Sequence, residues 1–196
     1  MRKIDLGRSR FVYIQTVPLP TRTYRLLLGL VLLLGCLHIA VHYAPFEDAY
    51  ITYRYAENWA HGHGPVYNPG ERVEGATSLG WTFILAVIAR AGLPLETSSR
   101  FLSAFCGLML AMATIHLARR ALRVSQTSGW LLVAAMGVVA SGTFAYYAGS
   151  GMETTLFATG VTLSAAQMIG DGSRRGLRIT GALLAVTAMI RPEGVG

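Results

Sequence analysis

The sequence is poor in charged residues and in cysteine. Asp, Glu, Lys and Arg make up 14% of the 196 residues, and 53% of the residues are apolar. Soluble domains carry roughly 25% charged residues. The two cysteines, Cys36 and Cys106, lie in separate apolar runs without the CxxC spacing of a metal or redox motif. The composition therefore argues against a soluble domain and against a disulfide framework, and it indicates a membrane protein.

The positive charge of the chain is arranged as in a membrane protein rather than as in a nucleic-acid-binding protein. The formal charge is +7, but the basic residues form short clusters between apolar runs instead of one solvated face. We therefore expect the lipid bilayer to be a partner of this chain, and we expect no nucleic acid.

Five apolar stretches approach the roughly 20 residues that a helix needs to cross a bilayer. They cover about residues 26–43, 101–118, 129–149, 154–170 and 177–190. The first lacks an A-x-A-like cleavage site and is followed by further stretches, so it is predicted to be a retained anchor and not a signal peptide. Residues 79–89 form a shorter stretch that ends near Arg90, Gly92 and Pro94, which favours an interfacial or re-entrant helix. The predicted fold class is all-α integral membrane.

The distribution of charge decides the predicted topology. If residues 79–93 do not cross, 12 of the 17 Lys and Arg fall into the cytoplasmic segments 1–25, 119–125 and 171–178, and 8 of the 10 acids fall outside. If they do cross, two arginine clusters move to the outer side and the positive-inside pattern largely disappears. We therefore predict a multi-pass plasma-membrane protein with a basic cytoplasmic N-terminus (1–25), a membrane part (26–196) and an external loop (44–100).

The external loop opens with the acidic pair Glu47 and Asp48. Asp48 has a side chain that caps helices, which predicts a helix over residues 49–60 that ends at the GHGP breaker and lies flat on the membrane. On this helix the stripe of Ile51, Tyr55 and Trp59 is expected to face the lipid headgroups. Another face is expected to line a cavity, and it holds Tyr50, Arg54 and Glu57 or Asn58.

The predicted topology brings three acid-bearing segments to the outer side of the membrane. They are Glu47 with Asp48, Glu153 in the sequence GMET, and Glu193 beside Arg191 in RPEG. A site built from the ends of several spans is therefore expected there. Simpler interpretations stay open. The acidic pair and Glu153 could each serve only a helix N-terminus, and Arg191 could pair with Glu193 or mark the headgroup boundary.

The segment EDAYITYRYAENWAHGHGPVYNPGERVEGATSLGWTFILA (47–86) resembles the signature loop of a bacterial family of GT-C fold glycosyltransferases that use polyprenyl-phosphate sugars. It is similar to the loop of the mycobacterial terminal arabinofuranosyltransferases. The resemblance continues through GLPLE (92–96), SGMETTLF (150–157) and RPEG (191–194). It implies a GT-C type transmembrane helix bundle with an extracytoplasmic loop of interfacial helices. It also implies a longer protein, of which this chain is the N-terminal part.

The resemblance further implies transfer of a sugar, with arabinofuranose as the first candidate, from a polyprenyl-phosphate donor to a cell-envelope glycan acceptor on the outer face. A carboxylate would act as general base on the acceptor hydroxyl, with Asp48 as the first candidate and Glu47 as the alternative. Arg54 and Arg191 are the candidates for binding the donor phosphate. The candidate supporting residues of the site are Tyr50, Tyr53, Glu74, Glu153 and Glu193.

A divalent metal ion, Mg²⁺, Mn²⁺ or Ca²⁺, is a further candidate component, with Glu47, Asp48 and Glu153 as its ligands. Two other function classes stay open, a non-catalytic subunit of an envelope-assembly complex and a transporter. The predicted spans carry almost no charges, whereas a transport path is commonly marked by intramembrane charges, so transport is disfavoured.

Overall fold

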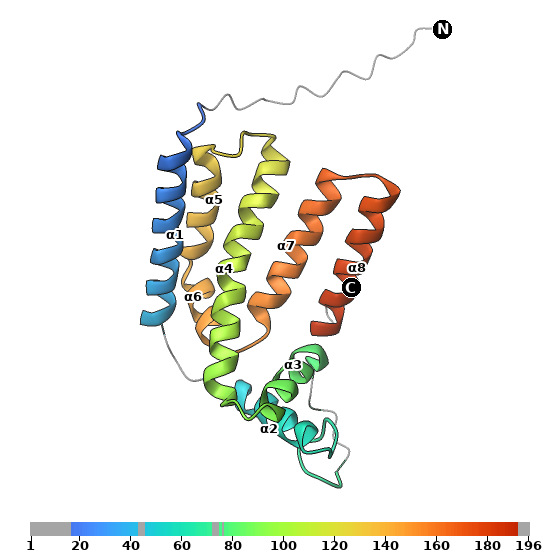
Figure 1. Ribbon diagram of the computed structural model, residues 1–196. Coiled ribbons are helices and arrows are strands. Elements are labelled where there is room, and N and C mark those ends of the chain that lie inside the picture. Colours follow the sequence, from blue (N-terminus) through green and yellow to red (C-terminus); the bar gives the residue numbers. More distant parts are fainter. Residues whose placement is uncertain (1–16, 43–45, 72–74, 76, 192–196) are drawn as a thin grey trace, which may run out of the picture.

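The computed structural model describes residues 17–42, 46–71, 75 and 77–191, and these residues form eight helices and no strand (Figure 1). The predicted all-α class is therefore confirmed for the described part of the chain. In chain order the helices are α1 (Thr21–Val41), α2 (Glu47–Ala60), α3 (Leu79–Arg90), α4 (Leu95–Leu122), α5 (Gly129–Val139), α6 (Gly142–Gly149), α7 (Thr154–Gly170) and α8 (Arg174–Ile190).

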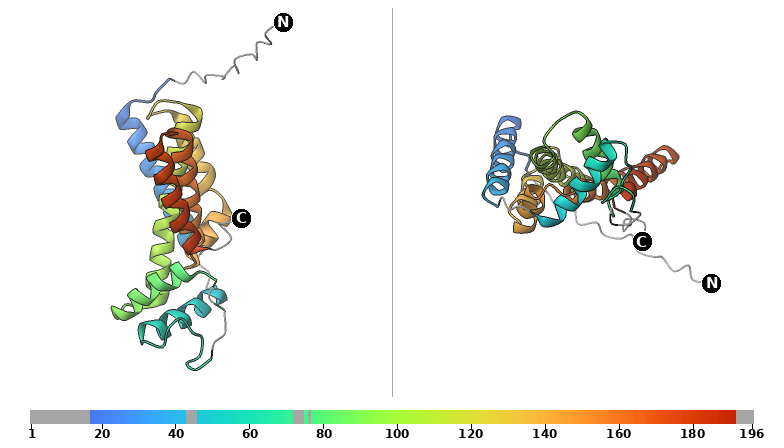
Figure 2. Two further views of the ribbon diagram at one scale, coloured as in Figure 1. Left: turned by 90° about the vertical axis from the view of Figure 1, so that its right-hand side faces the viewer. Right: turned by 90° about the horizontal axis from the view of Figure 1, so that it is seen from below.

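The longer helices lie side by side, with α4 and α7 in the middle, α1 and α5 on one flank and α8 on the other (Figures 1 and 2). Their direction alternates along the chain, because each is joined to the next at one end of the bundle. The starts of α4 and α7 and the end of α8 therefore share one end, and α2 and α3 pack against each other there. We call this the loop end of the bundle.

Two helices of the described residues, α1 and α4, are long and apolar enough to cross a membrane. A third candidate is the pair α5 and α6, which is bent by 63° at a short break. Helices α7 and α8 have 17 residues each, and α3 is a shorter apolar helix of 12 residues. The structure thus supports a membrane protein with two or three candidate spans.

The stretch 129–149, predicted as one span, is divided in the structure into α5 and α6, and this bent pair remains a candidate span. The break falls at Ser141 and Gly142, a Ser and Gly pair of the kind at which helices kink. Carbonyl groups in the last turn of a helix lack intrahelical partners. In α5 one of them, the carbonyl of Val139, accepts a hydrogen bond from Nδ1 of His38 on α1 at 2.7 Å. The contact between α1 and α5 stabilises the bend.

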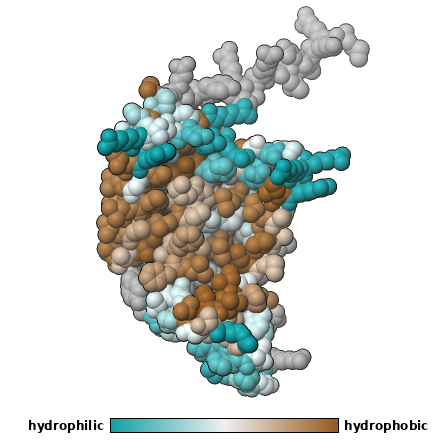
Figure 3. All heavy atoms as spheres, viewed as in Figure 1, coloured by the Kyte–Doolittle hydropathy of each residue, from teal (hydrophilic) through white to brown (hydrophobic). Residues whose placement is uncertain are grey.

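The outer surface of the bundle is a broad apolar belt between two hydrophilic ends (Figure 3). Large side chains such as Leu30 and Leu37 on α1 and Phe101 and Phe105 on α4 point outward and are exposed. In water such a continuous apolar surface would favour aggregation. Lipid chains cover it without cost, so the surface agrees with the membrane assignment.

Small polar side chains join α4 to α7 inside the bundle. The hydroxyl of Ser103 lies 3.0 Å from the carbonyls of Tyr147 and Met152. In turn, Thr155 Oγ1 donates to the carbonyl of Ser103 at 2.8 Å, and Thr159 Oγ1 donates to the carbonyl of Cys106 at 3.0 Å. Short hydroxyl side chains let membrane helices approach closely and bond across their interface. The two bonds of Ser103 fix the turn between α6 and α7 at the loop end.

Candidate functional site

The acidic pair lies in the first turn of α2, and both Glu47 and Asp48 are exposed. The predicted cap at Asp48 is wrong, because α2 begins at Glu47 and Phe46 is the residue that precedes its first turn. Carboxylates in the first turn of a helix are favoured by the helix dipole. This interaction allows α2 to begin two residues earlier than predicted, and it leaves both carboxylates at the surface.

The two acids lie on different faces of α2. Residues that are three, seven and ten positions apart share a helix face, so Glu47 is aligned with Tyr50, Arg54 and Glu57. Asp48 is instead aligned with Tyr55 and Trp59, seven and eleven positions further on. The two candidates for the general base are therefore distinguished by the surfaces that they adjoin.

The face of α2 that continues from Glu47 lines a cleft of about 430 Å³ at the loop end. As predicted, Tyr50, Arg54 and Glu57 face a cavity. The alternative residue Asn58 does not, because it is buried and its side-chain amide donates to the carbonyls of Val66 and Tyr67, at 2.8 Å each. The cleft, which we call the tyrosine cleft, is lined by Tyr50, Tyr53, Arg54, Glu57, Tyr67, Pro94, Leu95 and Glu96.

The face that continues from Asp48 differs from the prediction in one residue. Ile51 is exposed and Trp59 is half-buried, but Tyr55 is 2% exposed and does not face lipid. Its ring lies beside Tyr67, with centroids 5.8 Å apart, and a Cβ added at Gly75 would meet the Tyr55 hydroxyl. The loop after α2 folds back over this tyrosine. Periodicity within α2 could not reveal that contact.

Trp59 lines a second cleft, of about 470 Å³, between α3 and the end of α8. The ring of Trp59 packs against Phe83 with centroids 5.4 Å apart. Gly80 allows the two helices to approach, since a Cβ at this position would lie 2.7 Å from the carbonyl oxygen of Met189. We call this the apolar cleft, and its lining residues are Trp59, Thr77, Leu79, Gly80, Phe83, Ala188 and Met189.

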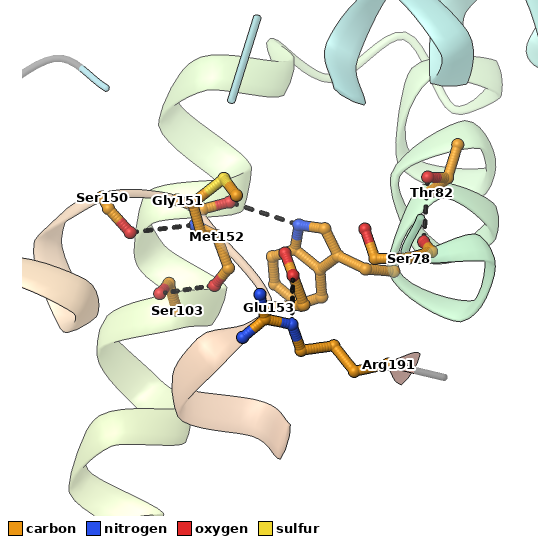
Figure 4. A network of polar contacts seen from close by, with 9 residues as sticks. Ser78, Thr82, Ser103, Ser150, Gly151, Met152, Glu153 and Arg191 are labelled. Carbon is orange, nitrogen blue, oxygen red and sulfur yellow. Dashed lines mark hydrogen bonds and ion pairs between the residues drawn. The ribbon is translucent and has the colours of Figure 1, made fainter. Parts of the chain in front are cut away.

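Glu153 and Arg191, from segments far apart in the sequence, meet at the loop end (Figure 4). Nε of Arg191 lies 3.3 Å from Oε1 of Glu153. Glu153 is 2% exposed, whereas the side chain of Arg191 is 39% exposed. Glu153 immediately precedes α7, as the interpretation of an acid at a helix N-terminus expects, and it is in addition buried and paired with Arg191. The predicted convergence of these two segments is confirmed.

The turn before Glu153 is held by neighbours that the sequence did not single out. Nε1 of Trp81 on α3 donates to the carbonyl of Gly151 at 3.2 Å, and the amide of Met152 donates to Oγ of Ser150 at 3.2 Å. Trp81 is fully buried. Its position in a short apolar helix predicted only an interfacial residue, so no local signal marked this role. The bond connects α3 to the segment that carries Glu153.

Hydrogen bonds order the polar wall of the tyrosine cleft. Nε of Arg54 donates to the carbonyl of Tyr67 at 3.2 Å. Glu96 forms an ion pair with Arg100, with Oε1 and Nη2 3.0 Å apart. The hydroxyls of Tyr53 and Ser99 are 2.6 Å apart. The structure thus brings Arg54 to this cleft and Arg191 to Glu153, and it does not gather the two arginines around one point.

Two tyrosine hydroxyls of this cleft are held in the neutral form. Burial raises the pKa of Tyr53, and the hydrogen bond with Ser99 offsets part of this shift. Partial loss of solvent raises the pKa of Tyr50, and a hydrogen bond and the negative charge from Glu96 raise it further. Both phenols therefore remain hydrogen-bond donors and acceptors through the physiological pH range.

The structure describes most, but not all, of the predicted site residues. Glu74 and Glu193 lie outside the described residues. Among the residues that are described, no group of three or more His, Cys, Asp or Glu side chains could hold a metal ion together. Glu47, Asp48 and Glu153 therefore do not form one such group in this structure.

No family model and no solved structure matches the chain. Part of the chain is similar to a known glycosyltransferase. The terminal beta-(1->2)-arabinofuranosyltransferase of Mycobacterium tuberculosis is 44% identical to it over 50 residues. This match covers 26% of the present chain and 8% of the length of the mycobacterial protein. The similarity supports a glycosyltransferase-like function, in partial agreement with the resemblance seen in the sequence.

Proposed function

We propose that this chain is part of a GT-C type membrane glycosyltransferase that transfers a sugar, arabinofuranose, from a polyprenyl-phosphate donor to a cell-envelope glycan outside the cytoplasm. The observation that carries the proposal is the geometry of the loop end. There the acids of α2, the Glu153 and Arg191 pair and an apolar cleft adjoin one end of an apolar bundle. The partial similarity to an arabinofuranosyltransferase supports the type of reaction and the sugar.

The apolar cleft suits the lipid part of such a donor. Its lining residues are aliphatic or aromatic except for Thr77, and α3 and α8 border it at the edge of the apolar belt. A polyprenyl chain can enter such a cleft sideways from the bilayer, since it exchanges contacts with lipid tails for contacts of similar polarity. In our proposal the tail lies beside Trp59 and Phe83, and the phosphate points toward the polar groups of the loop end.

Arg191 is the proposed partner of the donor phosphate. It follows Met189 of the apolar cleft by two residues, and Glu153 orients its guanidinium through Nε. A guanidinium presents five N–H donors, and the side chain of Arg191 is 39% exposed. As the sugar leaves, the phosphate gains negative charge, which a preoriented arginine stabilises.

Asp48 is the proposed general base, because it lies on the face of α2 that leads to Trp59 and the apolar cleft. The acceptor hydroxyl loses its proton to the carboxylate of Asp48 while its oxygen forms a bond to the anomeric carbon of the donor sugar. The bond between that carbon and the phosphate oxygen breaks, and its electron pair leaves with the polyprenyl phosphate.

The test is a matched pair of isosteric variants in purified protein reconstituted into liposomes with a polyprenyl-phosphate arabinofuranose and an arabino-oligosaccharide acceptor. We expect Asp48→Asn to lower transfer by roughly 10²- to 10⁴-fold, the usual contribution of a general base. Glu47→Gln should retain activity within about tenfold. The assignment of the base fails if Asp48→Asn turns over normally.

Glycan analysis of a deletion strain separates this proposal from a role in assembly alone. If this protein is the enzyme, the wild-type protein restores the transferred sugar to the deletion strain, and Asp48→Asn leaves the strain without it. A non-catalytic subunit would restore the glycan equally well with Asp48→Asn, and that outcome would refute the proposed function.

A further inference from the structure

The tyrosine cleft is separate from the lipid-facing cleft and has a different chemistry. It lies on the face of α2 that carries Tyr50, Arg54 and Glu57, and the start of α4 closes its other side with Pro94 and Glu96. The proposed transfer assigns Asp48, Arg191 and the apolar cleft to the base and the donor. It leaves this second cleft, of about 430 Å³, without an occupant.

The cleft offers ring faces together with hydrogen-bonding groups. Tyr50 and Tyr67 are 47% and 43% exposed, and the rings of Tyr50 and Tyr53 meet edge to face with centroids 5.4 Å apart. Glu57, Glu96 and Arg54 line the same cleft as these rings. Aromatic surfaces cover the C–H faces of sugar rings, and carboxylates and guanidinium groups satisfy the hydroxyls at their edges.

The charge of the lining argues against a phosphate as the occupant. Two carboxylates face one arginine in the cleft, and the Nε–H of that arginine is already donated to the carbonyl of Tyr67. With the ion pair between Glu96 and Arg100 counted, the charges around the cleft balance, so a phosphate would find no excess of positive charge there. A neutral ligand with many hydroxyl groups satisfies both signs of charge.

The polar groups are held in place before any ligand binds. Arg100 holds Glu96, Ser99 holds the hydroxyl of Tyr53, and the carbonyl of Tyr67 holds Arg54. Groups that are already ordered lose little conformational entropy on binding. This order is typical of a recognition site and is not needed by a connecting loop.

We propose that the tyrosine cleft is a saccharide-binding subsite that holds the acceptor glycan a short distance from its reacting end. The identity of the saccharide rests on the proposed function, but the existence of the subsite does not. Tyr50 lies three residues, about 4.5 Å along the helix axis, from Glu47, and two residues, about 3.0 Å, from Asp48. A glycan bound over Tyr50 can therefore extend its terminal hydroxyl toward the first turn of α2.

The experiment measures binding without any donor, so that transfer cannot contribute to the result. A linear arabino-oligosaccharide with a fluorescent label at its reducing end is titrated with the detergent-purified full chain. Tyr50→Ala and Tyr67→Ala are the test variants, because both rings are exposed. Since the ring of Tyr67 also lies beside the buried Tyr55, the folding of Tyr67→Ala is compared with that of the wild type. Tyr146→Ala is the matched control, since this tyrosine of α6 is 40% exposed but does not line the cleft.

We expect each test variant to weaken binding roughly tenfold, and Glu57→Gln to weaken it several-fold, since exposed aromatic side chains commonly dominate recognition. Tyr146→Ala should bind as the wild type does. The helical circular dichroism and melting temperature of each variant are measured alongside, and Tyr50→Phe and Tyr67→Phe should restore binding. The inference is overturned if the wild type does not bind the oligosaccharide, or if all variants bind equally.

Failure of the subsite and failure of the proposed function are distinguishable. Wild-type protein that binds the oligosaccharide through Tyr50 and Tyr67 but transfers no sugar would refute the proposed function and support the subsite. Normal transfer by the wild type, combined with an unchanged acceptor KM in Tyr50→Ala and Tyr67→Ala, would support the proposed function and refute the subsite. Spermine, added as a competitor, tests a cationic occupant, and tight competition by spermine together with weak saccharide binding would overturn the inference.

Discussion

Glu153 and Asp48 both lie at the start of a helix at the same end of the bundle, but their surroundings differ. Glu153, just before α7, is 2% exposed, and its carboxylate faces Nε of Arg191 at 3.3 Å. Asp48, in the first turn of α2, is exposed. A buried acid beside a cation holds segments of the fold together, whereas an exposed acid can be reached by a substrate and can exchange a proton. Two acids in similar local sequence contexts therefore have different physical roles.

The largest expected difference between Glu153 and Asp48 is in how much the stability of the protein falls when each acid, or its partner, is substituted. Arg191→Gln should destabilise the protein by about 3 kcal/mol, because it removes the cation that lies beside the buried carboxylate of Glu153. Glu153→Gln should cost about 1 kcal/mol, since the remaining arginine is 39% exposed and can be hydrated. Asp48→Asn should cost less than about 0.5 kcal/mol. Thermal melting followed by circular dichroism in detergent gives the order, and a destabilised Asp48→Asn would remove the contrast.

The turn that precedes Glu153 should tolerate little change. Gly151 has φ 78°, and a Cβ there would lie 2.7 Å from the Tyr53 hydroxyl and 2.8 Å from Oγ of Ser99. Gly151→Ala should therefore cost about 2 kcal/mol from strain and crowding together.

Gly62, which follows the end of α2, is the matched control. It has φ 86°, and a Cβ there would meet nothing within 4 Å. Gly62→Ala should cost about 1 kcal/mol from backbone strain alone. Equal melting temperatures for the two alanine variants would show that crowding around Gly151 is unimportant.

A smaller effect is expected from the hydrogen bond that connects α3 to the same turn. Trp81→Phe keeps most of the buried ring but removes the Nε1–H that donates to the carbonyl of Gly151 at 3.2 Å. The expected loss is about 1 kcal/mol, since a buried carbonyl then loses its donor. Trp59→Phe, which retains an aromatic ring beside Phe83, should cost less. Chemical denaturation of both variants measures the difference, and the reverse order would contradict the assigned bond.

The smallest expected effect is a pH dependence of stability, and it concerns Tyr53 in the tyrosine cleft. The pKa of Tyr53 is raised above 10.0, chiefly by burial. Its contribution to stability is therefore fully present below pH 10.0 and is lost as the pH rises through the folded-state pKa. The ultraviolet absorbance difference between the wild type and Tyr53→Phe reports this ionisation during an alkaline titration. A midpoint at or below 10.0 would contradict the burial of this hydroxyl.

Much of the helical pattern was predictable because it depends on local properties. Runs of apolar residues predicted helices near all five stretches, and the short stretch 79–89 became the separate helix α3. Alternation of charge along the chain then predicted that Glu153 and Arg191 would share one end, and the structure confirms it. Which side of the membrane this end faces, and the catalytic roles of Asp48 and Glu47, remain predictions.

Contacts between segments were less predictable. The break at Ser141 was missed because its stabilisation includes a hydrogen bond from His38, which is about a hundred residues away in sequence. The burial of Tyr55 was missed because the covering loop returns from beyond the helix. The role of Trp81 was missed because a tryptophan in a short apolar helix has the same local pattern whether it faces lipid or a buried turn.

The sequence by itself determined where most of the helices lie and that Glu153 and Arg191 share one end of the bundle, because apolar run length and charge spacing act along the chain. Only the tertiary structure decided that Glu153 is buried against Arg191 while Asp48 stays exposed, and that α2 separates an apolar cleft from a tyrosine cleft. Burial and cleft shape depend on which surfaces meet across α2, α3, α4 and α8. No periodicity within one helix encodes the partner that will cover it.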